Sequence, residues 1–311
     1  MRIDPNNAGP YDNLSNTLVR LNQFDEAEKT LREALSQGFD TPGYHQRLYE
    51  IAFIREDAAA MQQQIDWARG RPEELEALRW QAWTAEFGGK GRQADDFYRQ
   101  AIALARRDSL KSRESDITAE MAGTDALFGN CRQALDGVEP ALSLSRAATL
   151  NKGLTLALCG EPDQAQALAD EFFKANPKAD WISGGLAPEI RAWVELRRGN
   201  PGQAIQLLQQ VSTLYERFNF SANNVRGQAY LGLRAGKEAA VEFQKILDHR
   251  GVSPTSFHWA LAHLGSARAT ALTGDAAKSR KMYEAFLQLW KDADADIPIL
   301  IAAKAEYARL R

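Results

Sequence analysis

The side chains that could bind a metal ion are few in this sequence, and their spacing does not suit that role. The histidines are His45, His249, His258 and His263. His258 and His263 are five positions apart, which places them on different faces of a helix, whereas two zinc ligands on one helix need a spacing of four. We therefore expect both histidines to be packed in the interior or exposed to solvent.

Acidic and glycine-rich stretches are present, but they form no recognisable catalytic site. Asp292, Asp294 and Asp296 alternate like the start of a calcium loop, yet the sixth position of that loop is not glycine and the twelfth is not glutamate. No pair of carboxylates stands out as a general acid and base. The glycines near Gly89 and Gly199 do not follow a strand, as those of a phosphate-binding loop do. The sequence predicts no enzyme activity, no metal and no cofactor.

Two cysteines are present, Cys131 and Cys159. Each lies beside a glycine at the end of a helical run, so the two could meet at one edge of the molecule. A single pair cannot staple a fold of this length and gives no clear redox compartment. We interpret both as small buried hydrophobic residues, with a disulfide as the alternative.

The composition is that of a folded protein without a strong charge bias. Hydrophobic residues make up 44% of the 311 positions and charged residues 25%, and no apolar run is long enough to cross a membrane. The net charge is -3, and neither sign forms a long block that could neutralise a row of phosphates. We therefore expect no nucleic-acid partner and no direct membrane insertion.

A repeated pattern of helix, turn and helix runs along the chain. Glycines that close helical runs recur 31 to 39 residues apart, at Gly129, Gly160, Gly199, Gly236 and Gly274. After each glycine come a small residue and then a larger apolar one at helical spacing. The small residue lets two helices approach closely, and the larger one fills the space between hairpins. Because one hairpin cannot bury its apolar face alone, the pattern predicts a stacked array.

These units resemble the tetratricopeptide repeat family, whose unit is about 34 residues long. The residues that match its pattern are Tyr11, Leu14, Leu18, Ala27, Leu31, Ala34, Ala165, Phe172, Pro177, Gly227, Tyr230, Ala239, Phe243, Gly274, Ser279, Tyr283 and Phe286. The resemblance implies an all-α fold, a right-handed superhelical solenoid of helical hairpins. It also implies a non-catalytic scaffold that binds a protein or peptide partner.

The predicted organisation is a single array over residues 1–311 with about eight hairpins. Residues 1–7 resemble the truncated junction of a preceding repeat. Residues 297–311 read as a C-terminal capping helix, with Asp296 as its N-cap and Pro298 in its first turn.

Some units depart from the pattern. In the second unit Glu56 and Asp57 replace the glycine turn, and Pro140 should kink or shorten a second helix. Longer connectors interrupt the spacing over residues 181–188 and 218–223.

A narrower resemblance involves the stretches that begin at Glu242 and Leu289, EFQKILDHRG and LWKDADADIPILIAAKAEYARL. They are similar to the C-terminal repeat region of bacterial eukaryotic-like Ser/Thr kinases and winged-helix regulators. This resemblance implies that the array belongs to a larger bacterial signalling protein. The sequence contains no kinase motif of its own. Cytoplasmic and periplasmic locations both stay open, as does the oligomeric state.

Binding would occur on the inner concave face, which the first helix of each hairpin lines in an array of this kind. The inward candidates by their position in these helices are Asp12, Asn16, Arg20, Trp193, Arg197, Asn224, Gln228 and Arg268. The alternative interpretation is that most of them are solvated surface. The family's peptide clamp uses paired asparagines with lysines and an arginine. Asn16 and Arg20 match two of its elements, but the lysines are absent.

The tryptophans fit packing between helices better than a ligand box. The set considered is Trp80, Trp83, Trp181, Trp193 and Trp259. Two functions remain open at this point. The first is a protein-interaction scaffold. The alternative is a receptor for a small molecule or cell-wall fragment, with a pocket formed by the connectors around Trp181 and Phe218.

Overall fold

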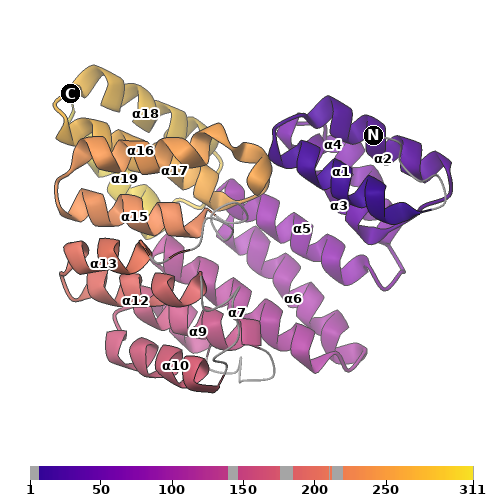
Figure 1. Ribbon diagram of the computed structural model, residues 1–311, viewed down its shortest axis with the longest axis horizontal. Coiled ribbons are helices and arrows are strands. Elements are labelled where there is room, and N and C mark those ends of the chain that lie inside the picture. The colour runs from indigo at the N-terminus through magenta and orange to yellow at the C-terminus, as the bar shows by residue number, and fades with distance from the viewer. Residues whose placement is uncertain (1–6, 139–145, 176–184, 210, 212–219, 311) are drawn as a thin grey trace.

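The computed structural model describes residues 7–138, 146–175, 185–209, 211 and 220–310 (Figure 1). Within these ranges the chain forms α-helices and one short 3-10 helix, with no strand. Helices adjacent in the sequence pack against each other in pairs. The predicted all-α array of helical hairpins is therefore confirmed.

The described helices are short and similar in length. In chain order they are α1 (Ala8–Arg20), α2 (Phe24–Ser36), α3 (Pro42–Ile54), α4 (Ala58–Ala68), α5 (Glu74–Phe87), α6 (Gly91–Arg107), α7 (Lys111–Phe128), α8 (Cys131–Val138), α9 (Arg146–Leu158), α10 (Pro162–Ala175), α12 (Leu186–Arg197), α13 (Pro201–Leu208), α15 (Ser221–Gly232), α16 (Gly236–Asp248), η1 (Arg250–Val252), α17 (Phe257–Leu272), α18 (Ala276–Leu289) and α19 (Pro298–Ala308). The paired helices run from α1 and α2 to α17 and α18, and α19 follows them unpaired.

Small residues in the helices set the close packing of the hairpins, as the pattern predicted. Ala27, Ala165 and Ser279 are completely buried. Phe243 of α16 is also fully buried, and it fits between α15 and α17 because both present glycine to it. A Cβ atom at Gly227 or Gly265 would come within 2.6 Å of the Phe243 ring. Shape complementarity at these contacts holds consecutive hairpins in register.

One turn differs from the expected glycine pattern. Gly129, Gly160, Gly199 and Gly274 have positive φ angles, but Gly236 does not. In that turn Arg234 takes the left-handed conformation instead, with φ 57°. Gly236 starts α16, where a Cβ atom would lie 2.6 Å from the Ala269 carbonyl oxygen. Its role is therefore the close approach of α16 to α17, which a turn pattern does not reveal.

The end of the array also differs in detail. Helix α19 begins at Pro298, but its N-cap is Ile297 and not Asp296. The Asp296 carboxylate accepts a hydrogen bond from Arg92 of α6 instead, at 2.5 Å. Leu300 and Ala303 bury one face of α19 in the C-terminal core. The predictions for Pro140, Pro177, Trp181 and Phe218 fall outside the described residues.

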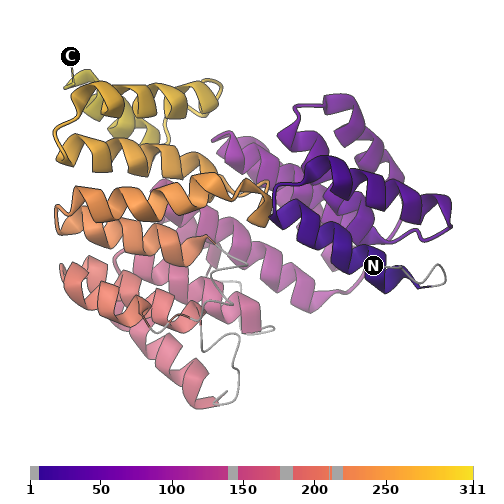
Figure 2. The same ribbon diagram turned by 45° about the horizontal axis from the view of Figure 1, so that its top comes forward.

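The array curves until its C-terminal part meets its N-terminal part, a region we call the junction (Figures 1 and 2). Its residues are Asp248–Phe257 and Trp290–Asp296 on one side and the facing parts of α1, α3, α5 and α6 on the other. Both oxygen and nitrogen of the Asn22 amide are used there: Nδ2 donates to the Asp248 carbonyl at 2.9 Å, and Oδ1 accepts from the Gly251 amide at 2.8 Å. Trp290 Nε1 donates to the Phe87 carbonyl at 3.0 Å. The inner face is therefore partly enclosed.

Arg250 occupies the centre of the junction. Its guanidinium lies over three aromatic rings, 4.7 Å from the centroid of Trp259, 5.4 Å from Phe87 and 5.7 Å from Phe53. Burial lowers the pKa of Arg250. The rings come from α3, α5 and α17, so this cation–π cluster links helices that lie far apart in the sequence.

Cys131 and Cys159 form a disulfide, with their Cα atoms 5.1 Å apart. The interpretation of the two cysteines as small buried hydrophobic residues was therefore wrong, and the alternative is the one that the structure shows. The bond joins the first residue of α8 to the turn after α9.

Reducing this disulfide is expected to lower the free energy of unfolding by about 3 kcal/mol. The reason is that the unfolded chain gains conformational freedom when a loop spanning 28 positions is opened. The measurement is the midpoint of urea unfolding with and without a thiol reductant. The matched control is the double variant Cys131→Ser with Cys159→Ser, on which the reductant should have no effect. Equal midpoints for the native chain in both conditions would contradict the prediction.

Candidate functional site

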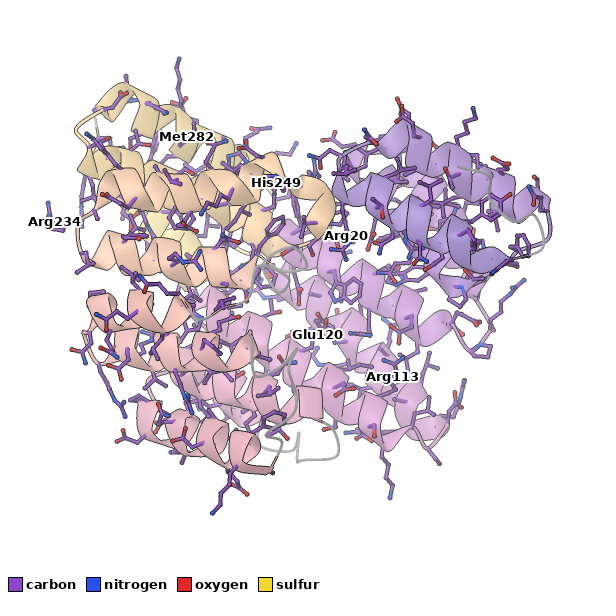
Figure 3. All side chains as sticks on the ribbon, in the orientation of Figure 1. Arg20, Arg113, Glu120, Arg234, His249 and Met282 are labelled. Carbon is purple, nitrogen blue, oxygen red and sulfur yellow. A yellow bond between two sulfur atoms is a disulfide. The ribbon has the colours of Figure 1, made fainter. Side chains whose placement is uncertain are left out.

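The inner face contains a cavity of about 440 Å³, which we call the N-terminal cavity. The first helices of four successive hairpins, α1, α3, α5 and α7, line it, together with residues 251–257 of the junction. Figure 3 labels Arg20 of α1 and Glu120 of α7, which lie near the middle of the molecule. The cavity thus depends on both ends of the array and on its curvature.

The lining of the N-terminal cavity carries charge of both signs. Arg20 and Arg47 come from the first two hairpins, and Glu86 and Glu120 from the third and fourth. Arg47 forms an ion pair with Asp12 at 2.8 Å. Arg20 donates from Nε to the Asn16 amide oxygen at 3.1 Å. Burial lowers the pKa of Arg20, and the opposite charge of nearby Glu50 counteracts this shift.

Glu120 is held firmly by its neighbours. Its Oε2 atom accepts two hydrogen bonds from Arg79, at 2.8 and 3.0 Å, and Oε1 accepts one from Trp83 Nε1 at 2.6 Å. Arg79 also pairs with Glu76 and lies 5.1 Å from the centroid of the Trp83 ring. These contacts fix the indole of Trp83 at the cavity wall.

Glu86 is the most unusual residue of the cavity. Only 2% of it is exposed, and its Oε1 atom makes no hydrogen bond of acceptable geometry with the described residues. Burial raises the pKa of Glu86 to about 8, and the negative charge of Glu120 acts in the same direction. The nearby Tyr98 and Thr124 hydroxyls counteract this shift only in part. A buried carboxyl with a vacant acceptor atom is costly, so such groups mark candidate functional sites.

A second cavity of about 290 Å³, the C-terminal cavity, contains the other predicted residues. Trp193, Arg197, Asn224, Gln228 and Arg268 all line it. Arg268 is engaged in a two-pronged ion pair with Glu306 of α19, at 2.8 and 3.0 Å. Arg197 donates to the Leu158 carbonyl at the end of α9.

The structure therefore divides the predicted candidates into two groups. Asn16 and Arg20 line the N-terminal cavity, whereas Asp12 reaches it only through Arg47. The arginines of the C-terminal cavity bind other parts of the fold, which leaves Trp193, Asn224 and Gln228 as its other polar or aromatic candidates.

Sequence reasoning missed the residues that make the N-terminal cavity distinctive. Glu86 and Glu120 belonged to the general set of acidic residues, and Trp83 was assigned to packing. No local signal identifies Glu86, because its burial depends on residues of other helices that lie beside it, such as Tyr98 of α6 and Thr124 of α7. One signal was available: Glu86 lies in a first helix, as Arg20 does, and residues of first helices are expected on the inner face.

The buried histidines do not form a site of this kind. Burial lowers the pKa of His258 and of His263 to about 4, and the charge of Arg250 adds to the shift of His263. Asp294 and Asp296 bind Arg92. In the ranges that the structure describes, no group of three or more histidine, cysteine, aspartate or glutamate residues is arranged to hold a metal ion. No described helix is long and apolar enough to cross a membrane.

Comparison with known proteins supports the first hairpin at the sequence level. A tetratricopeptide repeat family model matches residues 8–37, which contain α1 and α2. No curated protein gives a significant match.

Two solved structures illustrate the similarity of the fold. One is a tetratricopeptide repeat protein from Parabacteroides merdae, with 12% sequence identity and a TM-score of 0.49 over 92% of this chain and 98% of that chain. The other is the APC/C hetero-tetramer Cut9-Hcn1, with 14% identity and a TM-score of 0.48 over 95% of this chain and 54% of that chain. At these values the similarities carry no argument about a partner.

Proposed function

We propose that this chain is a non-catalytic scaffold that binds a segment of a partner protein on its inner face. The observation that carries the proposal is the N-terminal cavity, because four successive first helices contribute polar, charged and aromatic side chains to it. A surface built from several repeats suits an extended segment, which can place one side chain in the cavity and lie along the neighbouring helices. The C-terminal cavity offers a second anchoring point.

The test is a binding measurement with a peptide selected on this chain from a random display library. Trp83→Ala and Arg20→Ala are each expected to weaken binding of that peptide by about tenfold, since buried tryptophan and arginine contribute most to such interfaces. Lys278→Ala, on an exposed position of α18, is the matched control and should leave the affinity unchanged. Thermal unfolding of each variant verifies that the fold is retained.

The same experiment separates the two cavities. Loss of binding in Trp193→Ala and Gln228→Ala alone would move the site to the C-terminal cavity. Unchanged binding in all four inner-face variants would contradict the proposal that the inner face binds the partner.

A small-molecule receptor is the second candidate function, and the size of the N-terminal cavity favours it. A volume of about 440 Å³ falls within the usual range of ligand pockets. A thermal-shift screen distinguishes the two functions, because a ligand that binds the folded state raises its stability. Reproducible stabilisation by a metabolite, without stabilisation by any selected peptide, would favour the receptor.

We further propose that the array is the repeat region of a larger bacterial signalling protein. The support is the resemblance of the stretches beginning at Glu242 and Leu289 to the repeat regions of such proteins. Of the two compartments considered, the disulfide favours the periplasm, because disulfides persist in oxidising environments. The sequence of the parent protein would test the proposal: a chain without a signalling domain would contradict it.

A further inference from the structure

We propose that the N-terminal cavity takes one basic side chain of the partner segment, a lysine ammonium or an arginine guanidinium, with the Glu86 carboxylate as its counter-ion. This inference rests on the proposed function, because it specifies the chemistry of the segment that the inner face binds. It is carried by one geometric fact: the Glu86 carboxyl belongs to the cavity lining and is almost completely buried, and its Oε1 atom makes no hydrogen bond of acceptable geometry with the described residues.

The charges around the cavity leave Glu86 as the uncompensated group. Among the described residues that line the cavity or pair in turn with its lining, the acidic ones are Asp12, Glu50, Glu76, Glu86 and Glu120, and the basic ones are Arg20, Arg47, Arg79 and Arg113. Arg47 pairs with Asp12, and Arg79 pairs with Glu120. Arg113 lies 3.3 Å from Glu76. Glu50 attracts Arg20, so when Glu86 is ionised one additional cation would balance the group.

The other two carboxyls of the lining already have hydrogen-bond donors. Both oxygens of Glu120 accept hydrogen bonds, from Arg79 and from Trp83. Glu50 accepts one from the Gln46 amide at 2.9 Å. A cation that enters the cavity would therefore pair with the Glu86 carboxyl, whose Oε1 atom makes no hydrogen bond of acceptable geometry with the described residues, and would lie near Trp83 in the same lining.

An anionic group fits the cavity less well. It would approach Arg20 and Arg47, but Arg47 already donates to Asp12 and to the Gly43 carbonyl. It would also bring negative charge close to the carboxyls of the lining, of which Glu86 is deeply buried and therefore expensive to surround with like charge. The balance of charge thus favours a positive group.

Proton transfer should accompany binding. Near neutral pH Glu86 is mostly protonated, because burial raises its pKa to about 8, and the charges of Glu120 and Asp125 act in the same direction. Other titratable groups from five helices surround Glu86. They are Arg20 of α1, Arg47 and Glu50 of α3, Arg79 of α5, Tyr98 of α6, and Glu120 and Asp125 of α7. When a cation binds, the carboxyl loses its proton to the buffer and the resulting carboxylate pairs with the cation.

The experiment compares peptide selection on the native chain and on Glu86→Gln. We expect the peptides selected on the native chain to contain a lysine or arginine at one fixed position, and Glu86→Gln to bind them at least about tenfold more weakly. Calorimetry in two buffers of different ionisation enthalpy should show release of about one proton at pH 7 from the native chain and none from the variant. Glu171→Gln, on an exposed position of α10, is the matched control.

A small probe tests the cavity without a peptide. At pH 8, n-butylammonium chloride should raise the melting temperature of the native chain more than sodium chloride does, and this difference should vanish in Glu86→Gln. The inference would be overturned if the selected peptides lacked a basic residue and Glu86→Gln bound them as tightly as the native chain does. If Trp83→Ala still weakened the binding of those peptides, the proposed function would stand. If no peptide could be selected, the proposed function would be contradicted. The proposal of a cation site would still stand if butylammonium raised the melting temperature of the native chain and not that of Glu86→Gln.

Discussion

Replacing Gly251 with alanine is expected to lower the free energy of unfolding by about 4 kcal/mol and to open the molecule. A Cβ atom at this position would lie 1.7 Å from the Val19 carbonyl oxygen and 2.9 Å from the Asn22 amide oxygen. Neither the backbone of α1 nor that of η1 can accommodate such a contact. The segment around Gly251 must then move away from α1.

This movement removes several interactions at once. The two hydrogen bonds of Asn22 contribute about 1 kcal/mol each. The stacking of Arg250 over Trp259, Phe87 and Phe53 contributes about 2 kcal/mol when it is shielded from water. The expected total of about 4 kcal/mol is the loss of these contacts at the junction.

Two measurements test this expectation. Chemical unfolding gives the loss of stability, and small-angle X-ray scattering should show a larger radius of gyration in Gly251→Ala than in the native chain. The matched control is Gly202→Ala in α13, where an added Cβ atom meets nothing within 4 Å and should be neutral or slightly stabilising. Native stability and an unchanged radius in Gly251→Ala would show that the junction is not a determinant of the shape.

The junction also explains which parts of the fold could be predicted from the sequence. The hairpins follow from local periodicity, since Ala27, Ala165 and Phe243 pack against helices close to them in the chain. The curvature that brings η1 against α1 results from small rotations added over many hairpins. No short pattern near Asn22 or Gly251 records a contact between residues 229 positions apart. An open concave face was therefore the natural expectation, and its partial closure was not.

The candidate site shows the same division. The position of Asn16 and Arg20 in a first helix was enough to predict an inward direction, and both line the N-terminal cavity. Whether such a residue is available to a partner depends on its neighbours in space. Arg268 illustrates this. It forms an ion pair with Glu306 of α19, and its position in a first helix does not predict that pair. Glu86 is the converse case: it is an ordinary acidic residue in the sequence, but in the fold its buried Oε1 atom makes no hydrogen bond of acceptable geometry with the described residues.

Replacing Glu86 with glutamine is expected to raise the free energy of unfolding by about 3.5 kcal/mol at pH 7. The pKa of Glu86 is about 8 in the folded chain, against 4.5 for an unperturbed glutamate. Between these pH values the unfolded chain releases a proton that the folded chain keeps, so stability falls as pH rises through this window. Each pH unit above 4.5 lowers the stability of the native chain by about 1.4 kcal/mol. The Glu86→Gln variant does not lose this stability, so the sum of the loss up to pH 7 is its expected gain over the native chain.

The pH dependence makes this prediction specific. The stability difference between Glu86→Gln and the native chain should be close to zero at pH 4.5, grow steadily toward pH 8 and level off above it. Urea unfolding at several pH values measures the difference. The matched control is Glu120→Gln, which removes a charge that pairs with Arg79 and should therefore destabilise the chain at neutral pH. A Glu86→Gln variant that is less stable than the native chain at pH 7, or whose difference does not change with pH, would contradict the prediction.

If Glu86→Gln is more stable than the native chain and also binds basic peptides more weakly, the role of Glu86 is in binding. A carboxyl that lowers the stability of the free chain at neutral pH is not explained by the packing of α5, because a neutral amide of the same shape would pack equally well. A bound cation removes the cost by supplying the missing charge, so part of the energy stored in the free chain contributes to binding. Glu86→Gln should thus be more stable than the native chain and bind basic peptides more weakly, whereas a purely structural carboxyl would change stability alone.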